Sequence, residues 1–235
     1  MTGVQTCALP ISKEFIFSNQ LTCLDKPCVS IFNSEDPVSL SWYEKYKNQT
    51  GRTSLLFSSD NISKDIQDAY PLIGRANRSN LGAALRVVEH FGVARDRIIS
   101  AVRTFESLPD RLQLIANIDN VRWYNDSKAT TPVSTIAAVE GIDEPKILIA
   151  GGYDKHIPFD ELGKVIVKRV KAVVLLGQTA DLIQKAIDDA GGGVLIRRVK
   201  SMPEAVSVCR EFAVAGDVVL MSPACASWDM FENYQ

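Results

Sequence analysis

The feature that most constrains this chain of 235 residues is a regular alternation of strand-like and helix-like segments in its second half. Short apolar runs alternate there with longer segments of helical periodicity. This alternation is typical of an α/β fold with a mostly parallel sheet and helices on both faces. The predicted strands lie at 121–124, 147–150, 172–176, 194–196 and 218–220, and the predicted helices lie near 132–140, 159–169, 179–189 and 202–214.

The connections between these segments contain residues that are common at helix N-termini and in tight turns. Thr179 and Ser201 are expected N-caps, and Ser201 with Glu204 three residues later forms a capping box. The run 191–193 consists of glycines and permits a tight turn. The local signals therefore agree with the alternating pattern.

The first half of the chain has weaker patterns. It predicts short strands at 27–32 and 54–57, with an acidic turn at 33–37 between them. Two helices are expected next, one from Leu81 to Phe91 and one from Arg95 to Thr104, because their apolar residues recur at helical spacing. The pattern breaks after the second helix, and a domain boundary is predicted near Ser107.

Composition restricts the function classes. The net charge is −2, so the clustered cationic surface of a general nucleic-acid binder is not indicated. No apolar run reaches the roughly 20 residues that span a bilayer. The five cysteines are odd in number and lack C-x-x-C spacing, which favours a reducing cytoplasm over a disulfide framework or a zinc site. Residues 1–11 lack a basic signal-peptide start and are interpreted as a foreign or artefactual segment.

Three of the predicted strands end in turns with functional side chains. These turns are 125–130 (Asn-Asp-Ser-Lys-Ala-Thr), 151–155 (Gly-Gly-Tyr-Asp-Lys) and 222–227 (Ser-Pro-Ala-Cys-Ala-Ser). In a doubly wound sheet, ligands bind outside the carboxyl ends of the strands. Lysines, hydroxyls and glycine-rich backbone at one edge predict a site that clamps a small acidic ligand.

Each turn also has a plainer interpretation. The glycines at 151–152 are as compatible with an ordinary turn as with an anion site. Cys225 is interpreted as a buried filler rather than a nucleophile, because neither His90 nor His156 is placed by the sequence to activate it. Asp126 and Lys128 are compatible with a surface ion pair, although the neighbouring hydroxyls favour a binding site.

Two nucleotide-binding motifs are missing from the sequence. It contains no G-x-x-x-x-G-K-[ST] segment, so these residues include no P-loop for a triphosphate and its magnesium ion. It also contains no G-x-G-x-x-G after a strand, which disfavours a dinucleotide-dependent oxidoreductase. Any nucleotide would be held only in part by this chain.

Taken together, the three turns resemble those of the D-glutamate-adding ligases of the Mur ligase family, and the similarity includes the following Trp-Asp-Met-Phe-Glu-Asn-Tyr at 228–234. The resemblance implies two domains. Residues 12–106 would be the last part of the central ATPase domain, also α/β. Residues 107–235 would be the Rossmann-like C-terminal domain that receives the amino acid, without its final segment.

The resemblance also implies a reaction. Family members use ATP and Mg²⁺ to convert the carboxylate of UDP-N-acetylmuramoyl-L-alanine to an acyl phosphate, which the amine of D-glutamate attacks in peptidoglycan synthesis. The implied enzyme is cytoplasmic and monomeric, with no nucleic-acid or membrane partner. Because the P-loop and magnesium ligands lie outside this sequence, no catalytic or metal-binding residue is assigned, and the chain is expected to be inactive alone.

The resemblance assigns binding residues position by position. The residues similar to the D-glutamate-binding set are Thr130, Lys155, Ser227, Trp228 and Tyr234. The residues similar to the ATP-binding set are Asn77, Asn80, Arg111, Asp126 and Lys128, with the asparagines at the adenine, Asp126 at the ribose, and Arg111 and Lys128 at the phosphates.

Three positions depart from the family pattern. Ala76 and Asp110 stand where histidines are usual, and Thr131 replaces a common asparagine. Asp110 places a negative charge beside Arg111 and is expected to weaken its hold on phosphate. The alternative hypothesis is a non-catalytic Rossmann-like module that binds an acidic metabolite or a nucleotide.

Overall fold

The computed structural model describes residues 28–230, which divide into two compact units. The described part of the first unit comprises residues 28–64 and 79–99, and that of the second comprises 65–78 and 100–230. The domain boundary expected near Ser107 stays a prediction. Residues 1–11 and Tyr234 lie outside the described residues.

The first unit contains a small parallel sheet. Strand β1 (Cys28–Asn33) pairs with β2 (Arg52–Phe57), and helix α2 (Pro37–Tyr46) connects them. Both strands were predicted, and the acidic turn expected after β1 lies at residues 34–36, directly before α2. Asp36 caps this helix by accepting a hydrogen bond from Ser39 N at 2.6 Å, and Pro37 provides the first-turn φ angle.

Three helices follow along the chain. Helix α3 (Lys64–Ala69) was not predicted, whereas α4 (Arg75–His90) and α5 (Arg95–Arg103) were. Helix α4 begins six residues before the predicted start at Leu81, directly after Gly74, whose φ is 93°. The apolar periodicity therefore identified the buried part of the helix but not its polar first turns.

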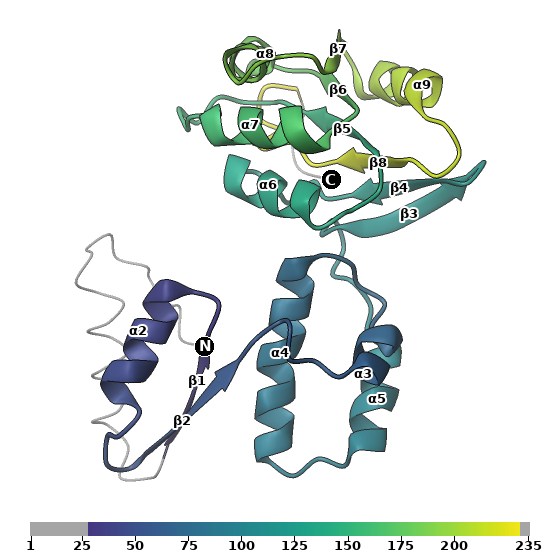
Figure 1. Ribbon diagram of the computed structural model, residues 1–235. Helices are drawn as coiled ribbons and strands as arrows, with labels where there is room; N and C mark the ends of the chain where they lie inside the picture. The colour runs from purple at the N-terminus through teal and green to yellow at the C-terminus, as the bar shows by residue number, and fades with distance from the viewer. Residues whose placement is uncertain (1–27, 231–235) are drawn as a thin grey trace. The chain divides into compact units, whose positions relative to one another are not determined.

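The second unit is built on a six-stranded sheet with the order β3-β4-β8-β5-β6-β7 (Figure 1). All neighbouring pairs are parallel except β3 and β4. The strands are β3 (Gln113–Ile118), β4 (Val121–Asn125), β5 (Lys146–Ala150), β6 (Ala172–Leu175), β7 (Leu195–Arg198) and β8 (Val218–Met221).

Strand β3 was missed by the sequence pattern. It forms a hairpin with β4, and the two turn residues Asp119 and Asn120 have φ angles of 53° and 61°. Aspartate and asparagine tolerate these angles better than other non-glycine residues, and such a turn suits the twist of a hairpin. The Asp-Asn pair before Val121 was the signal that could have revealed the strand.

Two apolar clusters occupy opposite faces of this sheet. Side chains alternate along each strand, so Leu148 of β5 faces helices α6, α7 and α8, whereas Ile147 and Ile149 face α9. The predicted mostly parallel sheet with helices on both faces is confirmed (Figure 1). The helices are α6 (Pro132–Glu140), α7 (Asp160–Arg169), α8 (Ala180–Asp189) and α9 (Met202–Phe212).

The helix starts confirm one predicted cap and correct another. Ser201 Oγ accepts a hydrogen bond from Glu204 N at 3.4 Å, so Ser201 caps α9 as predicted. The second bond of the predicted capping box is displaced by one residue, because Glu204 Oε2 accepts from Lys200 N at 2.8 Å and not from Ser201 N. Thr179 precedes α8 but makes no capping bond. Its hydroxyl instead bonds both backbone groups of Gly152, because burial beside that turn offers it partners there. None of the helices described between residues 28 and 230 has the length and apolar character to cross a membrane.

Candidate functional site

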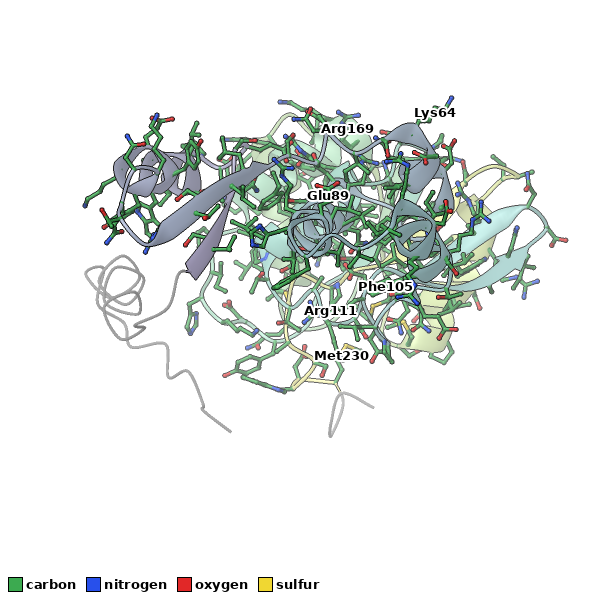
Figure 2. All side chains as sticks on the ribbon, turned by 90° about the horizontal axis from the view of Figure 1, so that it is seen from below. Lys64, Glu89, Phe105, Arg111, Arg169 and Met230 are labelled. Carbon is green, nitrogen blue, oxygen red and sulfur yellow. The ribbon has the colours of Figure 1, made fainter. Side chains whose placement is uncertain are left out.

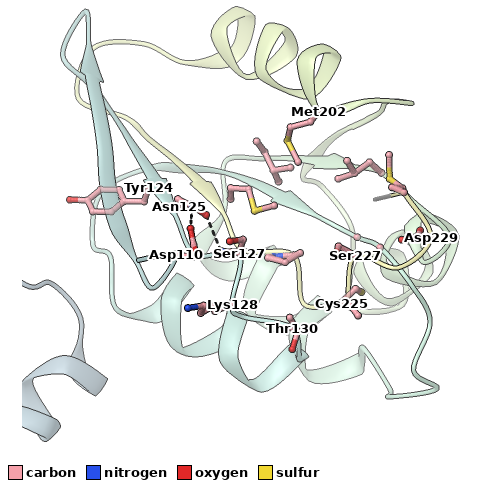
Figure 3. Close-up of a pocket in the computed structure, with 18 of the residues that line it drawn as sticks. Asp110, Tyr124, Asn125, Ser127, Lys128, Thr130, Met202, Cys225, Ser227 and Asp229 are labelled. Carbon is pink, nitrogen blue, oxygen red and sulfur yellow. Dashed lines mark hydrogen bonds between the residues drawn. The ribbon is translucent and has the colours of Figure 1, made fainter. Parts of the chain in front are cut away.

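The turns after β4, β5 and β8 meet at one edge of the sheet, as predicted. They come together because β8 lies between β4 and β5 with parallel pairing on both sides. A cavity of about 920 Å³ opens at this edge (Figure 3). Arg111 and Met230, both labelled in Figure 2, also lie on its wall.

The polar and apolar sides of this cavity come from different elements. The apolar side comes from β3, β4, β5, β8 and α9, and includes Ile115, Trp123, Ile149, Met202, Val206, Val219, Met221 and Met230. The polar lining residues come from the loop before β3, from the three turns and from the segment after the third turn, and include Asp110, Arg111, Asn125, Ser127, Lys128, Thr130, Lys155, Ser227 and Asp229.

The turn after β5 is fixed by close backbone packing. A Cβ atom on Gly151 would lie 1.9 Å from Leu176 O, and one on Gly152 would lie 2.3 Å from Ala226 O. Their N–H groups donate to Pro223 O at 2.9 Å and to Thr179 Oγ1 at 3.1 Å. Of the two interpretations left open by the sequence, the ordinary turn fits these glycines, because their N–H groups already have partners inside the protein.

Lys155 lies where two of the turns meet. Its Nζ donates to Thr130 O at 3.0 Å and lies 5.8 Å from the centre of the Trp228 ring. Trp228 is 69% exposed, and its ring packs beside that of Tyr153 with a centroid distance of 5.3 Å. The structure thus brings four of the five predicted D-glutamate residues to one cavity, namely Thr130, Lys155, Ser227 and Trp228.

The predicted ATP-binding residues divide into two groups. Arg111 and Lys128 are exposed and line the cavity. Asn77 does not line it, and its side chain donates to Ile73 O at 2.7 Å within its own unit. Asn80 belongs to the other compact unit. The structure therefore joins Arg111 and Lys128 with the D-glutamate set.

Asp126 does not line the cavity either. Its side chain is 8% exposed, and its two oxygens accept hydrogen bonds from Leu112 N at 3.1 Å and from Ser222 Oγ at 2.8 Å. Burial raises the pKa of the Asp126 carboxyl, while Ser222, the Leu112 N–H and the charge of Arg111 oppose that rise. The carboxylate thus joins three segments behind the cavity wall.

Cys225 is a buried packing residue and not an activated nucleophile, as the sequence suggested. The side chain is buried, and its sulfur lies 3.1 Å from Thr179 Oγ1. Burial raises the pKa of the thiol to about 11, so the reactive thiolate is scarce near neutral pH. The interpretation as a buried filler is confirmed.

Sequence reasoning missed the apolar side of the cavity. Met202 and Val206 belong to α9, and Ile115 belongs to the unpredicted strand β3. Trp123 alternates with Tyr124 along β4, so its place on the opposite face was readable from the strand pattern. Among residues 28–230, no group of three His, Cys, Asp or Glu side chains is placed to hold a metal ion.

The fold and the cavity define an α/β domain with a cavity at the carboxyl edge of a mostly parallel sheet, which is where folds of this class bind ligands. Residues 110–225 match the family of the Mur ligase, glutamate ligase domain. The chain belongs to the Mur ligase family.

Proteins named UDP-N-acetylmuramoylalanine–D-glutamate ligase are among its relatives. The one from Symbiobacterium thermophilum is 34% identical over 220 residues, which are 90% of this chain and 48% of that protein. The one from Lachnospira eligens is 35% identical over 239 residues, covering 100% of this chain and 50% of that protein. The chain thus spans about half the length of these curated relatives.

Solved structures show the same fold at lower sequence identity. MurF from Acinetobacter baumannii is 15% identical and matches with a TM-score of 0.60, over 88% of this chain and 50% of that one. At this identity the likeness concerns the fold alone.

Proposed function

We propose that this chain is the amino-acid-receiving part of an ATP-dependent ligase that joins D-glutamate to UDP-N-acetylmuramoyl-L-alanine. The observation that carries the proposal is the convergence of Thr130, Lys155 and Ser227 on one cavity, in a chain whose relatives are named for D-glutamate. The enzyme would work in the cytoplasm as a monomer, where its nucleotide substrates are available.

The cavity has the groups that a dicarboxylic amino acid needs. The Lys155 ammonium has three N–H donors and gives one to Thr130 O, so two remain for a carboxylate. Thr130 and Ser227 also line the cavity, and their hydroxyls would supply further donors. A charge-assisted hydrogen bond is about twice as strong as a neutral one, so Lys155 is the expected main anchor for a glutamate carboxylate.

The exposed cations suit the phosphate side of the reaction. In the proposed reaction, the γ-phosphoryl group of ATP passes to the alanine carboxylate and ADP leaves. The amine nitrogen of D-glutamate then attacks the carbonyl carbon, a C–N bond forms, the C–O bond to phosphate breaks and the amine loses a proton. Negative charge develops on the phosphate oxygens in both steps, and fixed cations such as Arg111 and Lys128 stabilise it.

Calorimetric titration of the chain with D-glutamate and with L-glutamate tests the proposed ligand. We expect preferential binding of the D-isomer and a loss of at least about tenfold in affinity on Lys155→Met, since one charge-assisted anchor is removed. Lys185→Met is the matched control, because Lys185 is an exposed lysine of α8 that pairs with Asp189. Equal affinity for both isomers would overturn the assignment.

A second measurement concerns ATP. Because the sequence contains no P-loop, we expect no glutamate-dependent ATP hydrolysis by the 235-residue chain. Such hydrolysis above the rate in buffer, retained in Lys185→Met and lost in Lys155→Met, would show that these residues suffice for the chemistry.

A further inference from the structure

Lys155 connects the turns after β4 and β5 with Trp228, which directly follows the turn after β8. The Lys155 Nζ donates to Thr130 O at 3.0 Å, and the same Nζ lies 5.8 Å from the centre of the Trp228 ring. A cation within about 6 Å of a ring centre is attracted by the charge distribution of the ring, and tryptophan gives the strongest attraction. The ammonium therefore has two partners, and they belong to different segments.

The second partner matters because a lysine side chain is flexible. Its ammonium sits on a long aliphatic stem, and ordering that stem costs conformational entropy. One hydrogen bond to Thr130 O fixes a single distance and leaves the rest of the Lys155 side chain free to move. Attraction to the Trp228 ring restricts that movement without taking up an N–H group as a hydrogen bond would. The remaining N–H groups of Lys155 stay available to a ligand.

The Trp228 ring is itself supported by Tyr153. The two ring centres are 5.3 Å apart and the ring planes are inclined by 49°, which lies in the range where aromatic pairs attract each other. Tyr153 belongs to the same turn as Lys155, and its N–H donates to Ala226 O at 2.8 Å. The ring pair therefore accompanies a backbone link between the turns after β5 and β8.

The backbone on both sides of Trp228 also has partners. Asp229 Oδ2 accepts a hydrogen bond from Gln178 N, in the turn after β6, at 2.8 Å. Met230 N donates to Ser227 O at 3.2 Å and closes a short turn that includes Trp228. Ser227 and Asp229 both line the cavity (Figure 3). An exposed ring is thus carried by a backbone that is tied to the edge of the sheet.

We propose that Trp228 is a positioning residue, whose ring holds the Lys155 ammonium at the cavity for a carboxylate of the incoming amino acid. Tyr153 supports the ring in this role. The inference rests on the proposed function for the identity of the ligand, whereas the contact between the ring and the ammonium does not depend on it. The role belongs to the Trp228 side chain and is separate from a contact of its backbone with the ligand.

Nuclear magnetic resonance tests the contact without a ligand. In the 235-residue chain labelled with ¹³C-lysine, the ring current of Trp228 should displace the Lys155 ε-CH₂ signal from the position shared by exposed lysines such as Lys185. The Lys155 signal is assigned by its loss in Lys155→Met. Trp228→Leu should return the signal to the position of the exposed lysines, whereas Trp228→Phe keeps a ring and should retain part of the displacement.

Two further variants control this measurement. Tyr153→Leu removes the support of the ring and should reduce the displacement of the Lys155 signal, but less than Trp228→Leu does. Phe91→Leu should leave the signal unchanged, because Phe91 is an exposed aromatic residue that does not line the cavity. A Lys155 signal that stays in place in Trp228→Leu would overturn the proposal.

Calorimetry with D-glutamate tests whether the contact serves ligand binding. We expect Trp228→Leu to weaken binding about two- to fivefold, which is the effect of one exposed contact between a cation and a ring. Fluorinated tryptophans at position 228 give a sharper series, since each fluorine weakens the attraction for a cation with little change in the size of the ring. The affinity should fall with each added fluorine, and an affinity that stays constant across the series would contradict the positioning role.

A double-mutant cycle separates action through Lys155 from a purely structural role of the ring. Trp228→Leu should weaken D-glutamate binding in the wild-type background, but by less than about 1.5-fold in the Lys155→Met background. Equal weakening in both backgrounds would overturn the proposal. If D-glutamate fails to bind while the Lys155 signal still depends on Trp228, the proposed function fails and the positioning of Lys155 stands.

Discussion

The turns after β4 and β5 line the same cavity, but different forces hold them. Side-chain hydrogen bonds to Asp126 hold the turn after β4, and these bonds reach residues of two other segments. The turn after β5 packs its backbone against Leu176 and Ala226 at distances that only glycine permits, and the Thr179 hydroxyl adds hydrogen bonds to Gly152. Hydrogen bonds to Asp126 can be removed one at a time, so the turn after β4 can be weakened gradually. The turn after β5 has no room for a Cβ atom at Gly151 or Gly152, so any larger residue there must displace the backbone.

This difference predicts how each turn responds to substitution. A hydrogen bond that is lost leaves the chain path intact and costs one interaction. A Cβ atom forced against a carbonyl oxygen displaces the backbone and every group that the turn carries, including Lys155.

Gly151→Ala is expected to have the largest effect. The new Cβ would lie 1.9 Å from Leu176 O, and the residue has a φ of 121°, so we expect the free energy of unfolding to fall by about 4 kcal/mol or more. Urea denaturation followed by circular dichroism measures this. Gly191→Ala is the control, because Gly191 has a φ of 115° but open space around it. Similar losses in both variants would refute the packing explanation.

Asp126→Ala should have an intermediate effect. The substitution leaves the Leu112 N–H and the buried Ser222 hydroxyl without their carboxylate partner, which destabilises the folded state. It also removes the cost of burying the Asp126 charge, which offsets part of the destabilisation. We expect unfolding free energy to fall by about 2 kcal/mol. Asp126→Asn keeps one acceptor and should lose about half as much. If Asp126→Ala lowered the free energy of unfolding as much as Gly151→Ala does, the proposed difference in how the two turns are held would be refuted.

The pH dependence of Asp126 gives a smaller effect. Burial raises the pKa of this carboxyl in the folded state above its ordinary value of 3.8, so the folded protein binds the proton more readily than the unfolded one. Protonation of Asp126 therefore stabilises the folded state. This contribution to the free energy of unfolding is fully present below pH 3.8 and is lost as pH rises through the pKa of the folded state.

Comparing the wild type with Asp126→Asn isolates this contribution. Between pH 3.8 and the folded-state pKa of Asp126, the unfolding free energy of the wild type should fall relative to that of Asp126→Asn as pH rises. Above that range the difference between the two proteins should stay constant. Denaturation curves taken across the acidic range measure it. A difference that shifts in the opposite direction would mean that Arg111 and the hydrogen bonds outweigh burial.

The smallest effect concerns Cys225, which packs against the turn after β5. Because its thiol pKa is raised to about 11, we expect alkylation by iodoacetamide at pH 8 to be at least about 100-fold slower than for an exposed cysteine. Mass spectrometry of the peptide that contains Cys225 measures the rate. The rate should rise to that of a free thiol in Gly151→Ala if that variant opens the turn, and it should stay low in Gly191→Ala.

Much of the fold of residues 121–221 was readable from the sequence. The strands β5, β6 and β8 are apolar on both faces, so they stand out as short continuous runs between helices. Strand β3 was not readable, because Leu114, Ile115 and Ile118 are each about half exposed and give no clear two-residue alternation. Its only local signal was the Asp-Asn turn.

The sequence predicted where the site lies in the fold, but it did not predict the hydrogen bonds among the residues of the site. The position of Lys155, Thr130 and Ser227 follows from the strand order alone, since all three residues follow adjacent parallel strands. The direction of Asp126 depends on Ser222, which lies 96 residues further along the chain. No local pattern reports a contact of that separation, so the sequence assigned this carboxylate to a ligand.

The place of β8 between β4 and β5 also has a consequence for folding in the cell. Translation makes β4 and β5 first, and both have unpaired apolar edges until residues 218–221 leave the ribosome. Exposed strand edges are templates for association with other chains. The cavity therefore forms only when β8 is inserted between β4 and β5, because two of its neighbouring walls are not adjacent before that step.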